Sequence, residues 1–147
     1  MVSMNRRSVM SLGLATLGAW LVRSSVGHAA TEPKSGDGLH QVALHLNSDD
    51  ERVQKGALSN IKNLYEEFGP GKVKIELITN GPGVKLFVKK ETKFAEELVL
   101  LKTKYGVEYT VCSNTMKGMK LTHEDLVDQV DRTVPAIVRL IELQEQG

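Results

Sequence analysis

The fold is decided by residues 41–51, which read QVALHLNSDDE. The apolar run over residues 41–47 predicts a short strand. Ser48 and Glu51 have the spacing of a capping box, which predicts that a helix starts there. From Val53 to Phe68 the apolar residues recur at spacings of three and four, which is one face of a helix. The stretch therefore predicts a strand that leads directly into a helix.

The same alternation continues along the chain. Runs of β-branched and other apolar residues predict two more strands, and apolar residues at helical spacing predict further helices. We expect strands at residues 73–78 and 107–112, a turn at 80–83, a short helix at 84–88, and helices at 94–105, 122–127 and 134–145. Parallel neighbours need crossover connections, which helices supply. The predicted fold class is therefore α/β, a three-layer α/β/α sandwich with a mainly parallel sheet.

The first 29 residues have the layout of a cleavable export signal. Arg6 and Arg7 precede an apolar run of ~14 residues, which is shorter than the ~20 that a helix needs to cross the hydrocarbon core. Small residues at Gly27 and Ala29 predict cleavage after Ala29. The arginine pair resembles the signals of the twin-arginine route, and the general secretory route, which uses the same layout, is the alternative. Both routes predict a periplasmic protein without a permanent membrane anchor.

Cleavage would leave one small domain. We expect a signal peptide at residues 1–29, a flexible leader at 30–39 and a single folded domain at 40–147. Three arginines would leave with the signal, so the 19 Lys and Arg fall to 16 against 18 Asp and Glu, a net charge of −2. This balance, with lysines scattered along the chain, gives no indication of binding to nucleic acid.

Cys112 is the single cysteine of the chain, so an intramolecular disulfide is impossible. It closes a predicted strand, and in such sheets ligands and chemistry gather beyond the carboxyl ends of the strands. A helix that starts near Thr115 or Met116 would direct backbone N–H groups at the sulfur and lower the pKa of the thiol. Two interpretations stay open: a reactive thiolate, or a small apolar side chain buried at the strand end.

Three loops are expected to meet at this edge of the sheet, at residues 47–49, 80–83 and 112–115. The candidate residues that shape a site around Cys112 are Asn47, Asn80, Gly81, Ser113, Asn114, Thr115 and His123. His123 is either a base that reaches back to the thiol or a solvated residue at a helix start. His45, on the first predicted strand, is interpreted as an interior or interface histidine. The chain lacks CxxC, HxxxH and phosphate-loop patterns, so we predict neither a metal nor a cofactor.

Several of these segments together resemble the DsrE/DsrF-like proteins. They are residues 42–49, 73–83, 111–116, 121–122 and 134–135, and the most specific part is Cys112-Ser113-Asn114-Thr115-Met116. The resemblance implies a compact α/β domain that assembles into a homo-oligomer, a trimer or a hexamer. For sulfur-oxidising members it also implies a cysteine that accepts sulfur and passes it on as a persulfide. On this chain Cys112 inherits that role, and Asn114 and Thr115 at most shape its loop.

Two functions stay open. The first is a periplasmic sulfur carrier or sulfurtransferase in which Cys112 is persulfidated, with separate proteins as sulfur donor and acceptor. The chemistry favours it over a dithiol oxidoreductase, because one accessible thiolate is sufficient for a carrier. The second is a non-catalytic oligomeric module that binds a small ligand or a partner protein in the same cleft, with Cys112 merely packed. Accessibility of the thiol separates the two.

Overall fold

A computed structural model describes residues 38–146. The predicted signal peptide and most of the predicted leader therefore lie outside the described residues. The elements follow in the order β1 (His40–Leu46), α1 (Glu51–Phe68), β2 (Val73–Thr79), η1 (Gly81–Phe87), α2 (Ala95–Tyr105), β3 (Glu108–Cys112), α3 (Ser113–Met119), η2 (His123–Asp125), β4 (Arg132–Val134) and α4 (Ala136–Gln146). Within residues 38–146, no helix has the length and apolar character needed to span a membrane.

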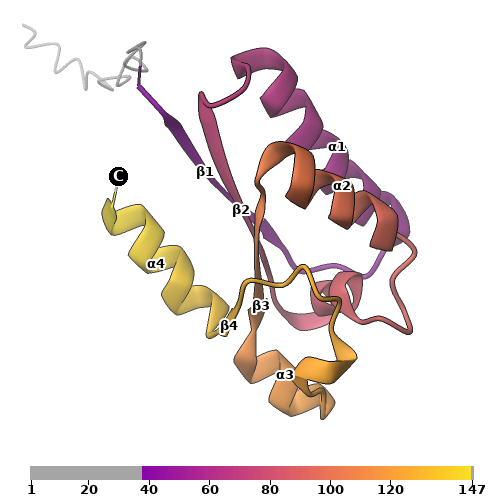
Figure 1. Ribbon diagram of the computed structural model, residues 1–147. Helices are drawn as coiled ribbons and strands as arrows, with labels where there is room; N and C mark the ends of the chain where they lie inside the picture. Colours follow the sequence, from indigo (N-terminus) through magenta and orange to yellow (C-terminus); the bar gives the residue numbers. More distant parts are fainter. Residues whose placement is uncertain (1–37, 147) are drawn as a thin grey trace, which may run out of the picture. The chain divides into compact units, whose positions relative to one another are not determined.

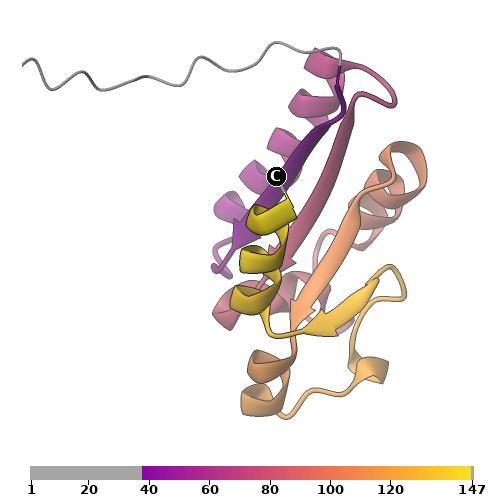
Figure 2. The same ribbon diagram turned by 90° about the vertical axis from the view of Figure 1, so that its left-hand side faces the viewer.

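The four strands form one parallel sheet in the order β1-β2-β3-β4. Leu44 of β1 pairs with Leu77 of β2, Leu77 pairs with Tyr109 of β3, and Cys112 pairs with Val134 of β4. Successive strands are neighbours and crossovers share one hand, so α1 and α2 lie on the same face of the sheet. The helix α4 lies on the other face (Figure 1 and Figure 2). The predicted three-layer α/β/α sandwich with a parallel sheet is confirmed.

The main core lies between the sheet and the layer formed by α1 and α2. The two layers contribute the fully buried side chains Leu58, Ile61, Ile75, Leu77, Leu98, Leu101 and Tyr109. The strand β2 is buried along nearly its whole length because both of its faces are covered, whereas exposure alternates along β1. Gln41, Ala43 and His45 are the exposed positions of β1. The second face of the sheet is therefore partly open along β1.

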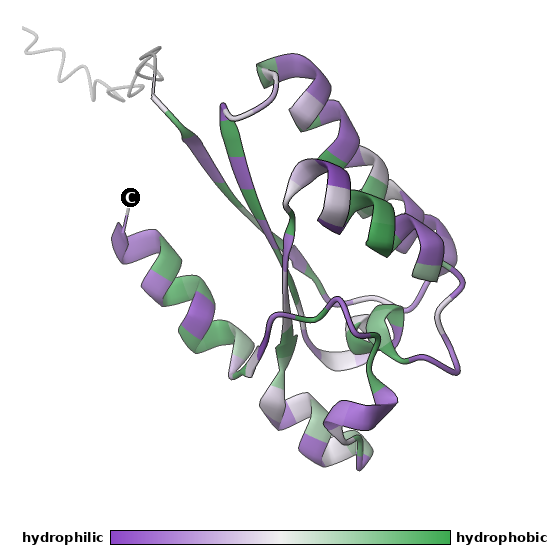
Figure 3. Cartoon of the chain, viewed as in Figure 1, coloured by the Kyte–Doolittle hydropathy of each residue, from purple (hydrophilic) through white to green (hydrophobic). Residues whose placement is uncertain are grey.

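The helix α4 packs on the second face. Its inner side chains Leu140 and Leu143 lie against a small buried cluster of Ile78, Cys112 and Ala136. Its outer side exposes Ile137, Val138 and Ile141. Figure 3 shows hydrophobic and hydrophilic residues succeeding one another along this helix. The second layer is thus thinner than the first and presents apolar side chains outward.

Two helix starts differ from the predicted ones. The N-cap of α1 is Asp50, whose carboxylate accepts hydrogen bonds from two N–H groups of the first turn at 2.8 and 3.3 Å. The predicted capping box of Ser48 and Glu51 is therefore wrong, and the Ser48 hydroxyl instead accepts from the N–H of Asp50 at 3.2 Å. The helix α3 begins at Ser113, earlier than predicted, because Cys112 is its N-cap.

The region after α3 differs most from the prediction. The sequence predicts no strand at Arg132–Val134, yet these residues pair with β3 as β4, which is too short to show a period-2 pattern. The predicted helix at 122–127 is a single 3₁₀ turn, η2, although its capping box of Thr122 and Asp125 is present. The N–H of Val127 donates to a carbonyl of η1 at 2.8 Å. This tertiary hydrogen bond takes the backbone group that a longer helix would need.

Candidate functional site

Cys112 lies at the junction of three elements. It is the last residue of β3 and the N-cap of α3, and the backbone N–H of Ala136, at the start of α4, donates to its Sγ at 3.5 Å. Ile78 of β2 and Leu140 of α4 belong to the same small apolar cluster. The residue is 7% exposed. The thiol therefore lies at the carboxyl end of the sheet, under the first turn of α4.

The groups around the sulfur favour the thiolate. Burial raises the pKa of the Cys112 thiol, but the N–H of Ala136, which donates to Sγ, and the polar groups of Thr115 and Asn114 at the start of α3 outweigh it. The net effect holds the pKa below its ordinary value. The donors belong to the first turns of α3 and α4, so the positive ends of both helix dipoles face the sulfur. Sequence spacing indicates the α3 donors but not Ala136, which is 24 positions away.

The three loops predicted to converge do meet at this edge of the sheet. The N–H of Gly81 donates to the hydroxyl of Thr115 at 3.0 Å, which joins the loop after β2 to α3. Gly83 packs so closely on the end of β1 that a Cβ there would lie 2.3 Å from the carbonyl oxygen of Leu46. Gly81 has a φ of +49°, which also favours glycine. The predicted turn at 80–83 and short helix at 84–88 merge here into the single 3₁₀ run η1.

The predicted site residues other than His123 lie in these converging loops. Ser113, Asn114 and Thr115 form the first turn of α3, and Asn80 and Gly81 follow β2. Asn47 follows β1 and is exposed, with its Cα facing Gly83.

The side chain of His123 contacts β4 and not Cys112. One of its ring nitrogens, Nε2, lies 3.1 Å from the hydroxyl of Thr133. Side chains alternate along a strand, so Thr133 lies on the face opposite to that of Val134, the partner of Cys112. Among residues 38–146 no hydrogen bond joins His123 to Cys112, and no three His, Cys, Asp or Glu side chains gather as a metal site there.

The histidine on the same face of the sheet as the thiol is His45. Its position in the sequence had suggested an interior or interface histidine. Its Nε2 lies 3.1 Å from the Oδ1 of Asn80. His45 pairs in register with Ile78, which packs with Cys112 under α4. The sequence indicates this face, because His45 alternates with Val42, Leu44 and Leu46 and so lies on the face of β1 opposite to theirs.

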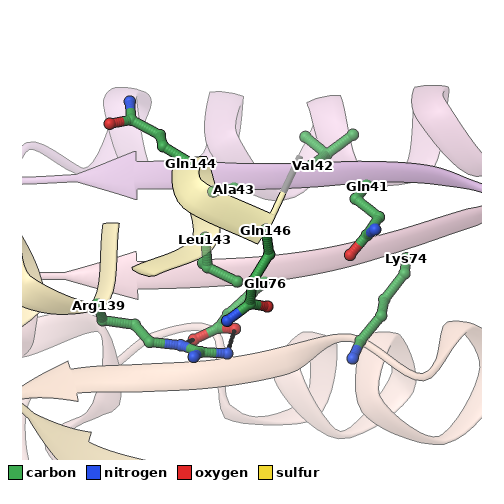
Figure 4. A pocket seen from close by; sticks show the side chains of 9 residues that line it. All are labelled: Gln41, Val42, Ala43, Lys74, Glu76, Arg139, Leu143, Gln144 and Gln146. Carbon is green, nitrogen blue, oxygen red and sulfur yellow. Dashed lines mark hydrogen bonds and ion pairs between the residues drawn. The ribbon is translucent and has the colours of Figure 1, made fainter. Parts of the chain in front are cut away.

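An ion-pair network surrounds the buried Glu76 of β2, on the same face of the sheet as the thiol. The Glu76 carboxylate accepts hydrogen bonds from Arg139 of α4 at 2.8 and 3.0 Å and from the Thr110 hydroxyl at 2.5 Å, and Arg132 of β4 lies 2.8 Å away. Burial raises the pKa of Glu76, but these partners outweigh it and lower the pKa to about 2. Figure 4 shows Arg139 reaching the carboxylate beside a cavity of about 280 Å³ that opens between β1, β2 and α4. The network fixes α4, and with it the N–H of Ala136, on the sheet.

The family model of the DsrE/DsrF-like family matches residues 26–147. This match includes every element of the described structure. The chain belongs to the DsrE/DsrF-like family. A comparison with curated proteins finds no match.

Two solved structures share the fold of this DsrE/DsrF-like chain. One is a protein of unknown function, MTH1491, from Methanobacterium thermoautotrophicum. It is 24% identical with a TM-score of 0.68, over 74% of this chain and 94% of that chain. The other is the ychN protein from E. coli, which is 13% identical with a TM-score of 0.57, over 75% of this chain and 94% of that chain. At these identities the likeness concerns the fold alone.

Proposed function

We propose that this DsrE/DsrF-like protein is a sulfur carrier in which Cys112 holds sulfane sulfur as a persulfide. The observation that carries the proposal is the position of Cys112 at the start of two helices: it is the N-cap of α3 and accepts from the N–H of Ala136 at the start of α4, and the pKa of its thiol is lowered. The thiolate is the nucleophile in sulfur exchange. The same groups stabilise the Cys112 thiolate when it leaves, after the sulfur has passed to an acceptor.

The transfer is a displacement without net oxidation. The Cys112 thiolate attacks the outer sulfur of a donor hydropersulfide, R–S–SH. The new Sγ–S bond forms, the donor S–S bond breaks, and the donor leaves as its thiolate with the electron pair, while the proton stays on the transferred sulfur or exchanges with solvent. A thiolate of the acceptor then attacks this outer sulfur and releases the Cys112 thiolate. One cysteine completes the cycle, and the chain has one.

We propose that this carrier works in the periplasm. The paired Arg6 and Arg7, the apolar run that follows and the small residues up to Ala29 support export by the twin-arginine route. Sulfur donor and acceptor proteins would then be partners in that compartment. N-terminal sequencing of the protein recovered from a periplasmic fraction tests this: a start at Ala30 agrees with it, and a start at Met1 contradicts it.

Burial of Cys112 favours a second function. Because Cys112 is only 7% exposed, a carrier needs a movement that uncovers the thiol for a donor protein. A non-catalytic oligomeric module, which binds a small ligand or partner protein, needs no such movement. In either case we propose a homo-oligomer, in keeping with the family resemblance and with the exposed Ile137, Val138 and Ile141 of α4.

Intact-mass spectrometry after incubation with inorganic polysulfide tests the carrier. We expect an adduct of about 32 Da, the mass of one sulfur atom, on the wild-type protein and none on Cys112→Ala. Alkylation of the native thiol is measured in parallel. If the wild type shows no adduct and its thiol alkylates only after denaturation, the carrier is excluded and the binding module is the better description.

A further inference from the structure

We propose that the Asn80 amide donates a hydrogen bond to the outer sulfur of the Cys112 persulfide, and that His45 positions this amide. This inference rests on the proposed sulfur-carrier function and adds a binding position to it. The donors described so far reach Sγ itself. A persulfide places a second, negatively charged sulfur about 2 Å further out, and that sulfur needs a donor of its own.

Register brings Asn80 beside Cys112. Thr79, the last residue of β2, pairs with Val111 of β3. Asn80 therefore follows β2 at the level of Cys112, the last residue of β3. Both have extended backbone angles, with φ and ψ of −142° and 175° for Asn80 and −67° and 113° for Cys112. Adjacent strands are about 4.8 Å apart, and alternation directs both side chains to the face that α4 covers. The amide and the thiol are therefore neighbours on one face.

The contact with His45 sets the orientation of the amide. The Oδ1 of Asn80 lies 3.1 Å from Nε2 of His45. A carbonyl oxygen only accepts, so the ring nitrogen donates. The Nδ2–H₂ group then lies on the other side of the amide, away from β1. Within residues 38–146, no hydrogen bond uses this group, although Asn80 is half-buried. Two donors are thus left for a ligand.

The backbone of Asn80 is fixed on both sides. Its N–H donates to the carbonyl of Leu46 at 3.2 Å, and its carbonyl accepts from Gly83 at 3.0 Å. The next residue, Gly81, donates to the hydroxyl of Thr115 at 3.0 Å, and Thr115 helps to lower the pKa of Cys112. Asn80, beside the outer sulfur, and Thr115, beside Sγ, are therefore held together through Gly81. If the contact of His45 with Asn80 only fastened the loop, its loss would change stability and leave the persulfide unaffected.

The test measures sulfur loading at equilibrium in three variants. His45→Leu removes the ring donor, His45→Gln retains a donor at the position of Nε2, and Asn80→Asp keeps an acceptor for His45 while it removes both amide hydrogens. Wild type and variants are incubated with inorganic polysulfide and a small thiol at a fixed ratio, and intact mass gives the loaded fraction. We expect the loading constant to fall about tenfold in His45→Leu and Asn80→Asp, the usual size for one hydrogen bond to a charged group, and to stay within about twofold in His45→Gln.

Two further readouts separate this role from a structural one. Thiolate absorbance near 240 nm, followed against pH, reports the free thiol, and we expect His45→Leu to titrate as the wild type does, because the donors to Sγ remain. Thermal unfolding reports the fold. Wild-type loading in His45→Leu and Asn80→Asp, or equal losses in His45→Leu and His45→Gln, would overturn this inference alone. Absence of any adduct on the wild type would overturn the sulfur carrier and this inference together.

Discussion

The two faces of the sheet have different compositions and different roles. The face toward α1 and α2 is packed with fully buried apolar side chains such as Leu58 and Leu77. The face toward α4 holds a small apolar cluster with Cys112, the Glu76 network, and the exposed side chains of β1. One layer therefore supplies most of the apolar burial that drives folding, while the other supplies polar groups held in fixed positions.

The largest effect is expected on the first face. Leu58→Ala deletes a fully buried side chain of α1 and should lower the free energy of unfolding by about 3 kcal/mol, through lost burial and the cavity that remains. Urea denaturation measures it. Leu100→Ala, at a leucine that is 46% exposed, is the control and should change stability by less than about 0.5 kcal/mol. The thiol titration of folded Leu58→Ala should match that of the wild type, and a shifted titration would mean that the faces are not separate.

A smaller loss of stability is expected on the second face. Glu76→Gln leaves Arg139 and Arg132 beside a neutral side chain, and because both arginines keep some contact with solvent, the loss should be about 2 kcal/mol, below that for a fully buried pair. Glu142→Gln, which changes the exposed partner of Arg139, should cost less than about 0.5 kcal/mol. Similar losses in the two variants would contradict the assigned role of Glu76.

The stability lost in Glu76→Gln should also depend on pH, and the direction of this dependence follows from the pKa of Glu76. The pKa of Glu76 is lowered from 4.5 to about 2 in the folded protein, so its ionised form stabilises the fold above pH 4.5. That contribution is lost as the pH falls from 4.5 to 2. The stability difference between wild type and Glu76→Gln should therefore shrink over this window. Denaturation curves at several pH values measure it, and a constant difference would show that the charge of Glu76 contributes nothing.

The sequence predicts the first face better than the second. Apolar periodicity identifies α1, β2 and α2, because each buries a continuous stripe or run in a single core. It also places Cys112 at a strand end. The sheet-to-α4 contacts escape prediction because they join distant positions: Arg139 meets Glu76 across 63 residues, and Ala136 meets Cys112 across 24. In sequence, a lone Glu on a strand and a lone Arg on a helix have the same pattern as solvated charges.

The sequence predicts the site less completely than the fold, again because some contacts of the site join distant positions. The sequence indicates backbone donors close to Cys112, because a helix that starts after a strand carries its free N–H groups in adjacent residues, although the helix begins at Ser113 and not near Thr115. The contact of His45 with Asn80 depends on the register of β1 against β2, which spacing along the chain does not give. For His123, two interpretations were open because separation along the chain does not give distance in the fold, and its ring lies against Thr133 of β4.

The smallest expected effect concerns one hydroxyl on the second face. Thr115→Val removes the hydroxyl that helps to lower the pKa of the Cys112 thiol and that accepts from the N–H of Gly81, so the pKa of the thiol should rise. Thiolate absorbance near 240 nm against pH measures the shift. Thr103→Val is the matched control, because its hydroxyl donates to a carbonyl within α2, on the first face. If both variants leave the titration unchanged, the backbone donors of α3 and α4 alone hold the thiolate. The chemistry would then depend on where two helices begin and not on the side chains of the loop.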